Sequence, residues 1–109
     1  MNIKQTLEQL GVPVANSVYE GSEETYIVFN EYNQAALLSA DDVEISTKFF
    51  YQVDIFSKYN YTDLVKQLRE LMREAGFGRM FESETYETNM KMYRKIMRFS
   101  YATNFEEVI

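Results

Sequence analysis

Carboxylates are the side chains of this sequence whose type and spacing could do chemistry. Acidic groups close together in a loop can bind a hard cation through their oxygens, although most such doublets only keep a surface hydrated. The sequence has no histidine and no cysteine, so the commonest general base, the commonest metal ligand and the most reactive nucleophile are missing. We therefore expect no enzyme activity and no catalytic, metal or cofactor site. The acidic groups are Glu23–Glu24, Asp41–Asp42 with Glu44, and Glu106–Glu107.

Asp54 is the one carboxylate embedded in a hydrophobic stretch, because it stands between Val53 and Ile55. One interpretation is the outward-facing residue of an alternating β-strand, and the other is a catalytic carboxylate. We favour the outward-facing residue. A deep pocket lined by Asp54 and a second acid would instead support a ligand-binding domain or an enzyme that uses carboxylates.

The segment "MKMYRKIMRFSY", residues 90–101, holds four of the eleven basic side chains of the chain. As a helix it gathers these four on one stripe, which is typical of a cationic amphipathic helix. As a strand it alternates well from Met97 onward and completes the sheet that the other strands need. We predict a strand, with a helix over residues 91–98 as the open alternative. The four basic residues are Lys91, Arg94, Lys95 and Arg98.

The chain as a whole is acidic, with 17 acidic and 11 basic side chains and a net charge of -6. This balance discourages general binding to nucleic acid or to an anionic membrane surface. As a strand, the basic segment lies beside an acidic strand with Glu82, Glu84 and Glu87, so we expect charge pairing within the chain. A nucleic-acid site would need stacking aromatic rings beside a positive field that neighbouring glutamates do not cancel.

The length of 109 residues fits one domain, residues 1–109, with a single core. No segment approaches the roughly 20 apolar residues that a membrane-spanning helix needs. The clearest element is a helix over about 61–75, with Asn60 as N-cap, a continuous apolar stripe and Gly76 after its last turn. A short N-terminal helix ending at Gly11 precedes it.

Runs of aromatic and β-branched residues predict four strands. Residues 35–43, between the first two strands, are expected to form a loop that is too long for a tight hairpin turn. The sequence therefore predicts an α+β domain: a single four-stranded, largely antiparallel sheet with the long helix packed on one face. The predicted strands cover residues 25–34, 44–58, 79–88 and 90–101.

Both central strands carry apolar side chains on both of their faces, although one helix can cover only one face of the sheet. The remaining aromatic surface would form a patch large enough to need a partner. A head-to-tail contact that closes into a ring is one symmetric way to supply that partner. The aromatic residues expected in the patch are Tyr26 or Phe29, with Phe50 and Phe56.

The order and spacing of several local strings resemble the small tail-terminator, or tail-completion, proteins of long-tailed phages and prophages. The strings run over most of the chain, and none is a catalytic signature. The resemblance implies a helix-flanked antiparallel sheet and a ring, commonly hexameric, that caps the tail tube, stops its polymerisation and joins it to the head connector. The strings are "LEQLGVPV", "YEGSEETYIVFN", "SADDVEI", "FFYQVDIFSK", "REAGF" and "YETNMKMYRKIMRFSY".

The resemblance also implies partners and a location. The chain would form a homo-oligomeric ring, contact the tail tube protein and the head-side connector protein, and let DNA pass without specific binding, which an acidic balance suits. An isolated copy could stay monomeric until the tube acts as a template. We expect the protein in the virion, at the tail or neck, and in the host cytoplasm before assembly. In this interpretation Arg94 or Arg98 contacts the acidic loop of a neighbouring subunit at Asp41 and Asp42.

Two other functions stay open at this point. One is a small acidic cytoplasmic protein of the immunity or inhibitor kind, which occludes a basic partner and need not self-associate. The other is a different head–tail neck protein, such as a stopper or an adaptor, which has a similar sequence pattern. Genes for a major tail protein and a tape measure downstream would favour the terminator, whereas a neighbouring toxin gene would favour the inhibitor.

Overall fold

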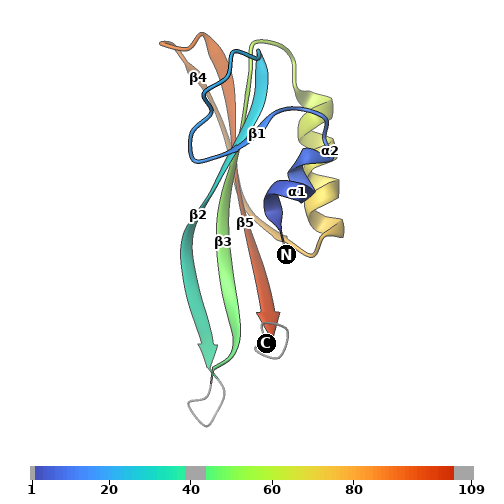
Figure 1. Ribbon diagram of the computed structural model, residues 1–109, viewed down its shortest axis with the longest axis vertical. Coiled ribbons are helices and arrows are strands. Elements are labelled where there is room, and N and C mark those ends of the chain that lie inside the picture. Colours follow the sequence, from blue (N-terminus) through green and yellow to red (C-terminus); the bar gives the residue numbers. More distant parts are fainter. Residues whose placement is uncertain (1, 39–43, 105–109) are drawn as a thin grey trace.

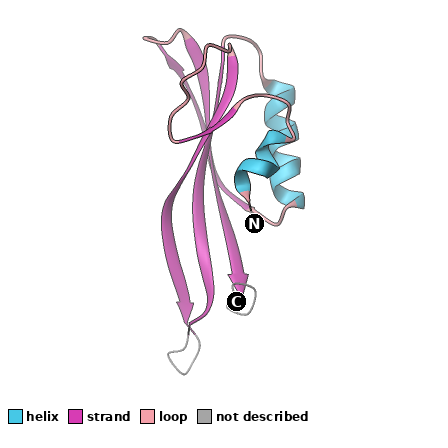
Figure 2. Cartoon of the chain, viewed as in Figure 1, coloured by secondary structure: helices cyan, strands magenta, loops and turns pink. Residues whose placement is uncertain are grey.

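The fold is one five-stranded sheet with two helices on one of its faces (Figure 1, Figure 2). The computed structural model describes residues 2–38 and 44–104. In chain order the elements are α1 (Ile3–Glu8), β1 (Val14–Asn16), β2 (Thr25–Leu38), β3 (Glu44–Ser57), α2 (Thr62–Glu74), β4 (Gly78–Glu87) and β5 (Met92–Asn104). The strand order is β1-β2-β3-β5-β4, and all neighbouring strands are antiparallel except β1 and β2. The predicted α+β class and largely antiparallel sheet are confirmed.

The sheet has five strands where the sequence predicted four. The additional strand, β1, pairs in parallel with residues 27–29 of β2. The backbone N–H of Ser17 continues this pairing by donating to the carbonyl of Phe29 at 2.8 Å. Three residues are too few to show an alternating pattern, so only the pairing with β2 reveals this strand.

The hairpin of β2 and β3 is longer than predicted. Residues 35–43 were expected to form a loop, but Ala35–Leu38 continue β2 and pair with residues 44–48 of β3. The loop prediction is therefore wrong for residues 35–38, and residues 39–43 lie outside the described part of the chain. Alanine and leucine favour no strand by themselves, so pairing with β3 decides their conformation.

The basic segment is a strand, and the helical alternative over residues 91–98 is wrong. β5 is hydrogen-bonded to β3 along one edge and to β4 along the other. Lys91 precedes the strand in the turn, with a φ of 55°. Two paired edges satisfy the backbone polar groups of β5, and this outweighs the helical spacing of its basic side chains.

α2 carries the predicted apolar stripe, but its N-cap is Tyr61 and not Asn60. The side-chain oxygen of Asn60 still accepts a hydrogen bond from the first helical N–H at 2.9 Å. At the other end Gly76 has a φ of 96°, and the N–H of Phe77 donates to the carbonyl of Met72 at 2.9 Å. The predicted glycine stop is thus confirmed, because the left-handed position favours a residue without a Cβ.

The main core lies between the helices and the sheet face toward them. Its buried members come from both helices, from β2, β3 and β5, and from the turn after α2, so it ties the two layers together. Burying each large apolar side chain stabilises the fold by about 1.5–3 kcal/mol. The buried residues of this core are Ile3, Leu7, Ile27, Phe29, Val53, Ile55, Val65, Leu68, Met72, Phe77, Met97 and Phe99.

The sheet is longer than the helix layer (Figure 1). The molecule measures 52 × 24 × 23 Å, and β2, β3 and β5 continue past the end of α2. We call residues 33–38, 44–50 and 101–104 the arm. β1 ends opposite Phe29 and β4 begins opposite Ser100, so neither edge of the arm has a neighbouring strand among the described residues. Each edge therefore presents backbone N–H and C=O groups that another chain could pair with.

Candidate functional site

The sheet face away from the helices, here called the outer face, is partly covered by the segment between β1 and β2. Residues 17–24 cross this face on the side opposite α2 (Figure 1). Tyr19 stacks on Tyr26 with ring centroids 4.1 Å apart, and Tyr26 stacks on Phe56 at 5.1 Å. Tyr26 and Phe56 are buried as a result. We call the part of the outer face under Tyr19 the sealed half.

Asp54 lies in the sealed half, where it is 5% exposed. Arg94 donates to Asp54 Oδ2 from Nη2 at 2.6 Å and from Nε at 3.1 Å, and Gln52 Nε2 donates to the same oxygen at 3.2 Å. Arg94 Nη1 also donates to Glu87 Oε1 at 3.2 Å. The outward-facing interpretation of Asp54 is therefore incomplete: the residue lies on the outer face, but inside a buried ion pair. All three hydrogen bonds reach the same oxygen, Oδ2, so Asp54 acts as the charge partner of Arg94 on this face.

The rest of the outer face, toward the arm, is not covered by residues 17–24, and we call it the open half. Arg98 lies there between two aromatic rings, with its guanidinium carbon 5.1 Å from the centroid of Tyr32 and 5.5 Å from that of Phe81. Its Nε donates to Gln52 Oε1 at 3.1 Å. Tyr32 and Phe81 are 41% and 48% exposed, and Tyr32 contacts Phe50 at 5.9 Å between centroids. We call Tyr32, Phe50, Phe81 and Arg98 the aromatic stripe.

Two β-bulges in the sheet change the direction of the side chains that form the aromatic stripe. Tyr32 is the extra residue of a β-bulge in β2, and Met80 is the extra residue of one in β4. A bulge bends its strand and changes where the neighbouring side chains point. Both bulges lie near the level of Arg98, which pairs with Phe81 across the sheet. They bring aromatic rings from both sides over the guanidinium at the base of the arm.

The helix side of the sheet carries a separate charge cluster around Glu82. Arg69 donates two hydrogen bonds to this carboxylate at 2.8 and 2.6 Å, Lys95 Nζ lies 3.2 Å from it, and Arg79 Nη1 lies 3.3 Å from it. The hydrogen bonds from Arg69 are the largest influence that lowers the pKa of Glu82, to about 2. Glu82 therefore stays ionised at neutral pH and joins α2, β4 and β5.

The expected charge pairing between β4 and β5 is confirmed for two of the three glutamates. Glu82 pairs with Lys95, and Glu87 pairs with Arg94 at 3.2 Å. Glu84 instead accepts a hydrogen bond from the hydroxyl of Tyr61 at 2.6 Å. Burial and this hydrogen bond raise the pKa of Tyr61.

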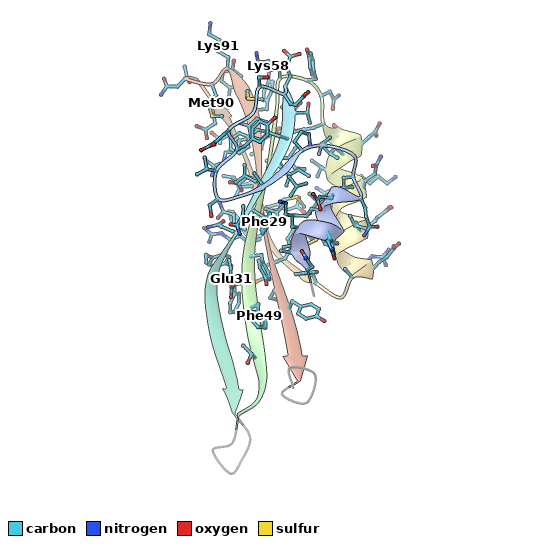
Figure 3. All side chains as sticks on the ribbon, in the orientation of Figure 1. Phe29, Glu31, Phe49, Lys58, Met90 and Lys91 are labelled. Carbon is cyan, nitrogen blue, oxygen red and sulfur yellow. The ribbon has the colours of Figure 1, made fainter. Side chains whose placement is uncertain are left out.

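The structure separates the aromatic residues that the sequence assigned to a contact patch. Phe50 lies in the open part of the outer face. Tyr26 and Phe56 lie on the same face but are buried beneath Tyr19. Phe29 lies on the opposite face in the main core, at the level of the helices (Figure 3). The expectation of one continuous open patch is thus wrong for Tyr26, Phe29 and Phe56, because the chain itself covers them.

The charged residues assigned to the contact also differ from one another. Arg98 is exposed in the aromatic stripe, whereas Arg94 already holds Asp54 and Glu87. Asp41 and Asp42 lie outside the described residues, so their pairing with a neighbouring subunit stays a prediction. Of the two arginines, Arg98 is the more exposed and the more open to a partner, since the side chain of Arg94 is 30% exposed.

Sequence reasoning missed the two tyrosines that define the sealed and open parts, Tyr19 and Tyr32. A tyrosine in a loop gives no periodic signal, and a bulge breaks the alternation that would place Tyr32. Gly21 is the one sequence signal that relates to the position of Tyr19, because a Cβ on residue 21 would lie 2.1 Å from the Tyr19 hydroxyl oxygen. The glycine allows the ring to lie across the loop.

Residues 2–38 and 44–104 contain no group of three or more acidic, histidine or cysteine side chains arranged to hold a metal ion. No helix in the same described part of the chain is long and apolar enough to cross a membrane.

Comparison with solved structures relates this fold to that of a virion component. No protein-family model matches the chain, and no curated protein matches it. The chain is similar to one in the structure "Virion of native gene transfer agent (GTA) particle", with a TM-score of 0.58 and 13% sequence identity. The similarity covers 90% of this chain and 84% of that chain. At this identity the comparison shows a shared fold.

Proposed function

We propose that this protein is a structural assembly protein of a virion of phage or prophage origin, and that it acts as a tail terminator. In this role, copies of the chain form a ring on the tail tube, stop its polymerisation and join it to the head connector. The observation that carries the proposal is the aromatic stripe at the base of an arm with two open edges.

The aromatic stripe has the composition of a protein contact. Tyrosine and arginine are enriched at the residues that dominate binding energy, and an arginine between aromatic rings is held in place before a partner arrives. Tyr32 and Phe81 leave nearly half of their surface in water in the isolated chain. A partner that covers this stripe would remove that apolar surface from water.

The arm offers a second mode of contact. Its open edges suit the addition of a strand from a neighbouring subunit or from the tube, which supplies backbone hydrogen bonds without a pocket. The arm also extends past the helix layer, so the helices do not cover it (Figure 2).

The shared fold and the charge support the same role. The similar chain belongs to the structure of a virion. A net charge of -6 suits a ring through which DNA slides, because like charges discourage the DNA from binding its wall.

Electron microscopy of particles from the genome that encodes this chain, with and without its gene, tests the proposal. We expect tails of uncontrolled length that fail to join heads when the gene is deleted, and normal particles when it is restored. Particles of normal length and yield without the gene would contradict the proposal. Tails of normal length that fail to join heads would instead indicate another neck protein, such as a stopper or an adaptor.

Complementing the gene deletion with variants of the chain tests whether the aromatic stripe is the assembly surface. Tyr32→Ala with Phe81→Ala should fail to restore joined particles, because it removes both rings of the aromatic stripe. Tyr59→Ala with Tyr86→Ala is the matched control, since these aromatic side chains are 59% and 49% exposed and lie outside the stripe. Equal restoration by both pairs would contradict the assignment of the surface.

A further inference from the structure

A cavity of about 410 Å³ lies on the helix side, between the end of α2 and the start of β4. Arg69, Arg73 and Arg79 line it together with Glu70, and it is also bordered by Phe77 and Phe99, which are only 5% and 1% exposed. Three of the five arginines of an acidic chain thus meet at one cavity. We call it the arginine cavity.

Positive charge exceeds negative charge at the arginine cavity, where three arginines stand beside two carboxylates, those of Glu70 in the lining and of Glu82. Arg69 is engaged by Glu82 through two short hydrogen bonds. Arg79 reaches the same carboxylate at 3.3 Å, but its side chain is 59% exposed. Arg73 is exposed and forms no ion pair within the part of the chain that the structure describes. An occupant that combines carboxylates with an apolar side chain would fit the guanidinium groups and the aliphatic parts of these arginines.

The segment that crosses the outer face has this combination. Glu20 and Glu23 are exposed and have no ion-pair partner among residues 2–38 and 44–104, and Val18 is 66% exposed. The hydroxyl of Tyr19 accepts a hydrogen bond from the N–H of Glu23 at 3.2 Å, while its ring stacks on Tyr26. The segment is therefore held in one shape, so little ordering is needed when it binds.

We propose that the arginine cavity of one copy binds residues 18–23 of the next copy. Glu20 and Glu23 pair with Arg73 and Arg79, and Val18 packs against the aliphatic parts of these arginine side chains. The proposal rests on the ring of the proposed function and names the two surfaces that meet in it. Within one copy the cavity lies on the helix side at β4, whereas the segment lies on the other side beside β2 (Figure 1). Such a contact is head-to-tail and can repeat until a ring closes.

Charge reversal on each side tests the pairing. Variant one carries Arg73→Glu and Arg79→Glu, and variant two carries Glu20→Arg and Glu23→Arg. Sedimentation velocity of the full chain should show self-association of the wild type that weakens with added salt. Each variant alone should associate at least about tenfold more weakly, because like charges then face each other. A mixture of the two variants should regain association, since each cavity then meets a segment of opposite charge.

Matched variants keep the test interpretable. Lys4→Glu with Lys91→Glu changes the net charge as variant one does, at exposed positions away from the cavity, and should leave association unchanged. Arg73→Gln with Arg79→Gln removes the charge without repulsion and should weaken association less than variant one. Circular dichroism of each variant checks that it folds as the wild type does.

Three results would overturn the inference: a wild type that does not self-associate, reversals that leave association unchanged, or a mixture that does not recover. The tail-length experiment stays separate from this one. A gene deletion that gives uncontrolled tails, together with reversals that have no effect, would keep the terminator and reject the cavity as its contact. Normal tails after deletion, together with recovery in the mixture, would keep the contact and reject the terminator.

Discussion

The sealed and open halves of the outer face differ in what the chain places over them. In the sealed half Tyr19 covers Tyr26, and Arg94 is bound to Asp54 and Glu87. In the open half Arg98 lies between exposed rings and donates a hydrogen bond to a neutral amide. The two arginines stand four residues apart on the same strand, so their environments differ through the loops and bulges around them and not through β5 itself.

This difference shows how one sheet face can serve both stability and binding. The buried carboxylate of Asp54 needs an opposite charge, which the half-buried Arg94 supplies, because leaving a charge unpaired in the interior is costly. An arginine between exposed rings has no such need and keeps its outer surface for a partner. The sealed half should therefore govern the free energy of unfolding, and the open half should govern assembly.

Arg94→Ala should break the sealed half most strongly. The change leaves the carboxylate of Asp54, which is 5% exposed, with only an amide as partner. We expect the free energy of unfolding to fall by about 3 kcal/mol, as for other buried ion pairs that lose one member. Urea unfolding followed by circular dichroism measures this value. A loss below about 0.5 kcal/mol, as for a surface pair, would contradict the buried role of Arg94.

Tyr19→Ala should open the sealed half and cost less. The change removes a ring stacked at 4.1 Å on Tyr26 and exposes the aromatic pair beneath it. We expect the free energy of unfolding to fall by about 2 kcal/mol. Tyr59→Ala is the matched control, because this ring is 59% exposed, and should cost less than half as much. Equal losses in the two variants would mean that Tyr19 does not seal the face.

Gly21→Ala tests whether the position of Tyr19 over the sealed half depends on the missing side chain at residue 21. A Cβ at this position would lie 2.1 Å from the Tyr19 hydroxyl oxygen, so the ring or the loop must shift. We expect a loss of about 1 kcal/mol in the free energy of unfolding. Because Tyr19 is already absent, Gly21→Ala should cost much less in the Tyr19→Ala background. Additive losses in this double-mutant cycle would contradict a direct clash.

The sequence predicts those parts of the fold that local pattern determines. The apolar stripe of α2 and the glycine after it, and the alternation in β3, are visible without any partner. β1 and residues 35–38 of β2 are not, since their conformation depends on pairing with a strand elsewhere in the chain. The helical spacing in β5 was the misleading signal, because both edges of this strand are paired.

In the candidate site, too, local pattern predicts some features, whereas others depend on contacts between distant parts of the chain. Alternation groups Phe50 with Phe56 and Arg94 with Arg98, each pair along its own strand, and the β4–β5 charge pairs follow from neighbouring strands. The pair of Arg94 with Asp54 joins residues 40 positions apart and needs the register of β3 against β5. The cover by Tyr19 depends on a loop without periodicity, so the sequence could not separate the sealed residues from the open ones.

Arg98→Ala should have the smallest effect on stability and the clearest effect on assembly. The side chain is exposed and forms no ion pair within the described residues, so the free energy of unfolding should change by less than about 0.5 kcal/mol. Joined particles should nevertheless decrease, because the guanidinium that fills the space between the two rings is lost. Arg98→Lys, which keeps the charge without the planar group, should restore them only in part. A large loss of stability would mean that Arg98 stabilises the fold as Arg94 does, and would contradict the difference between the two halves of the outer face.

Hydroxyl-radical labelling of the free protein and of purified tails, read by mass spectrometry, tests the central claim most directly. In the free chain Tyr32 and Phe81 should react readily, while Tyr26 and Phe56 should be protected, in keeping with their exposed and buried positions. On tails, labelling of Tyr32 and Phe81 should fall severalfold, with Tyr26 and Phe56 unchanged. Unchanged labelling of Tyr32 and Phe81 on assembled tails would contradict the claim that the open half of the outer face is an assembly surface.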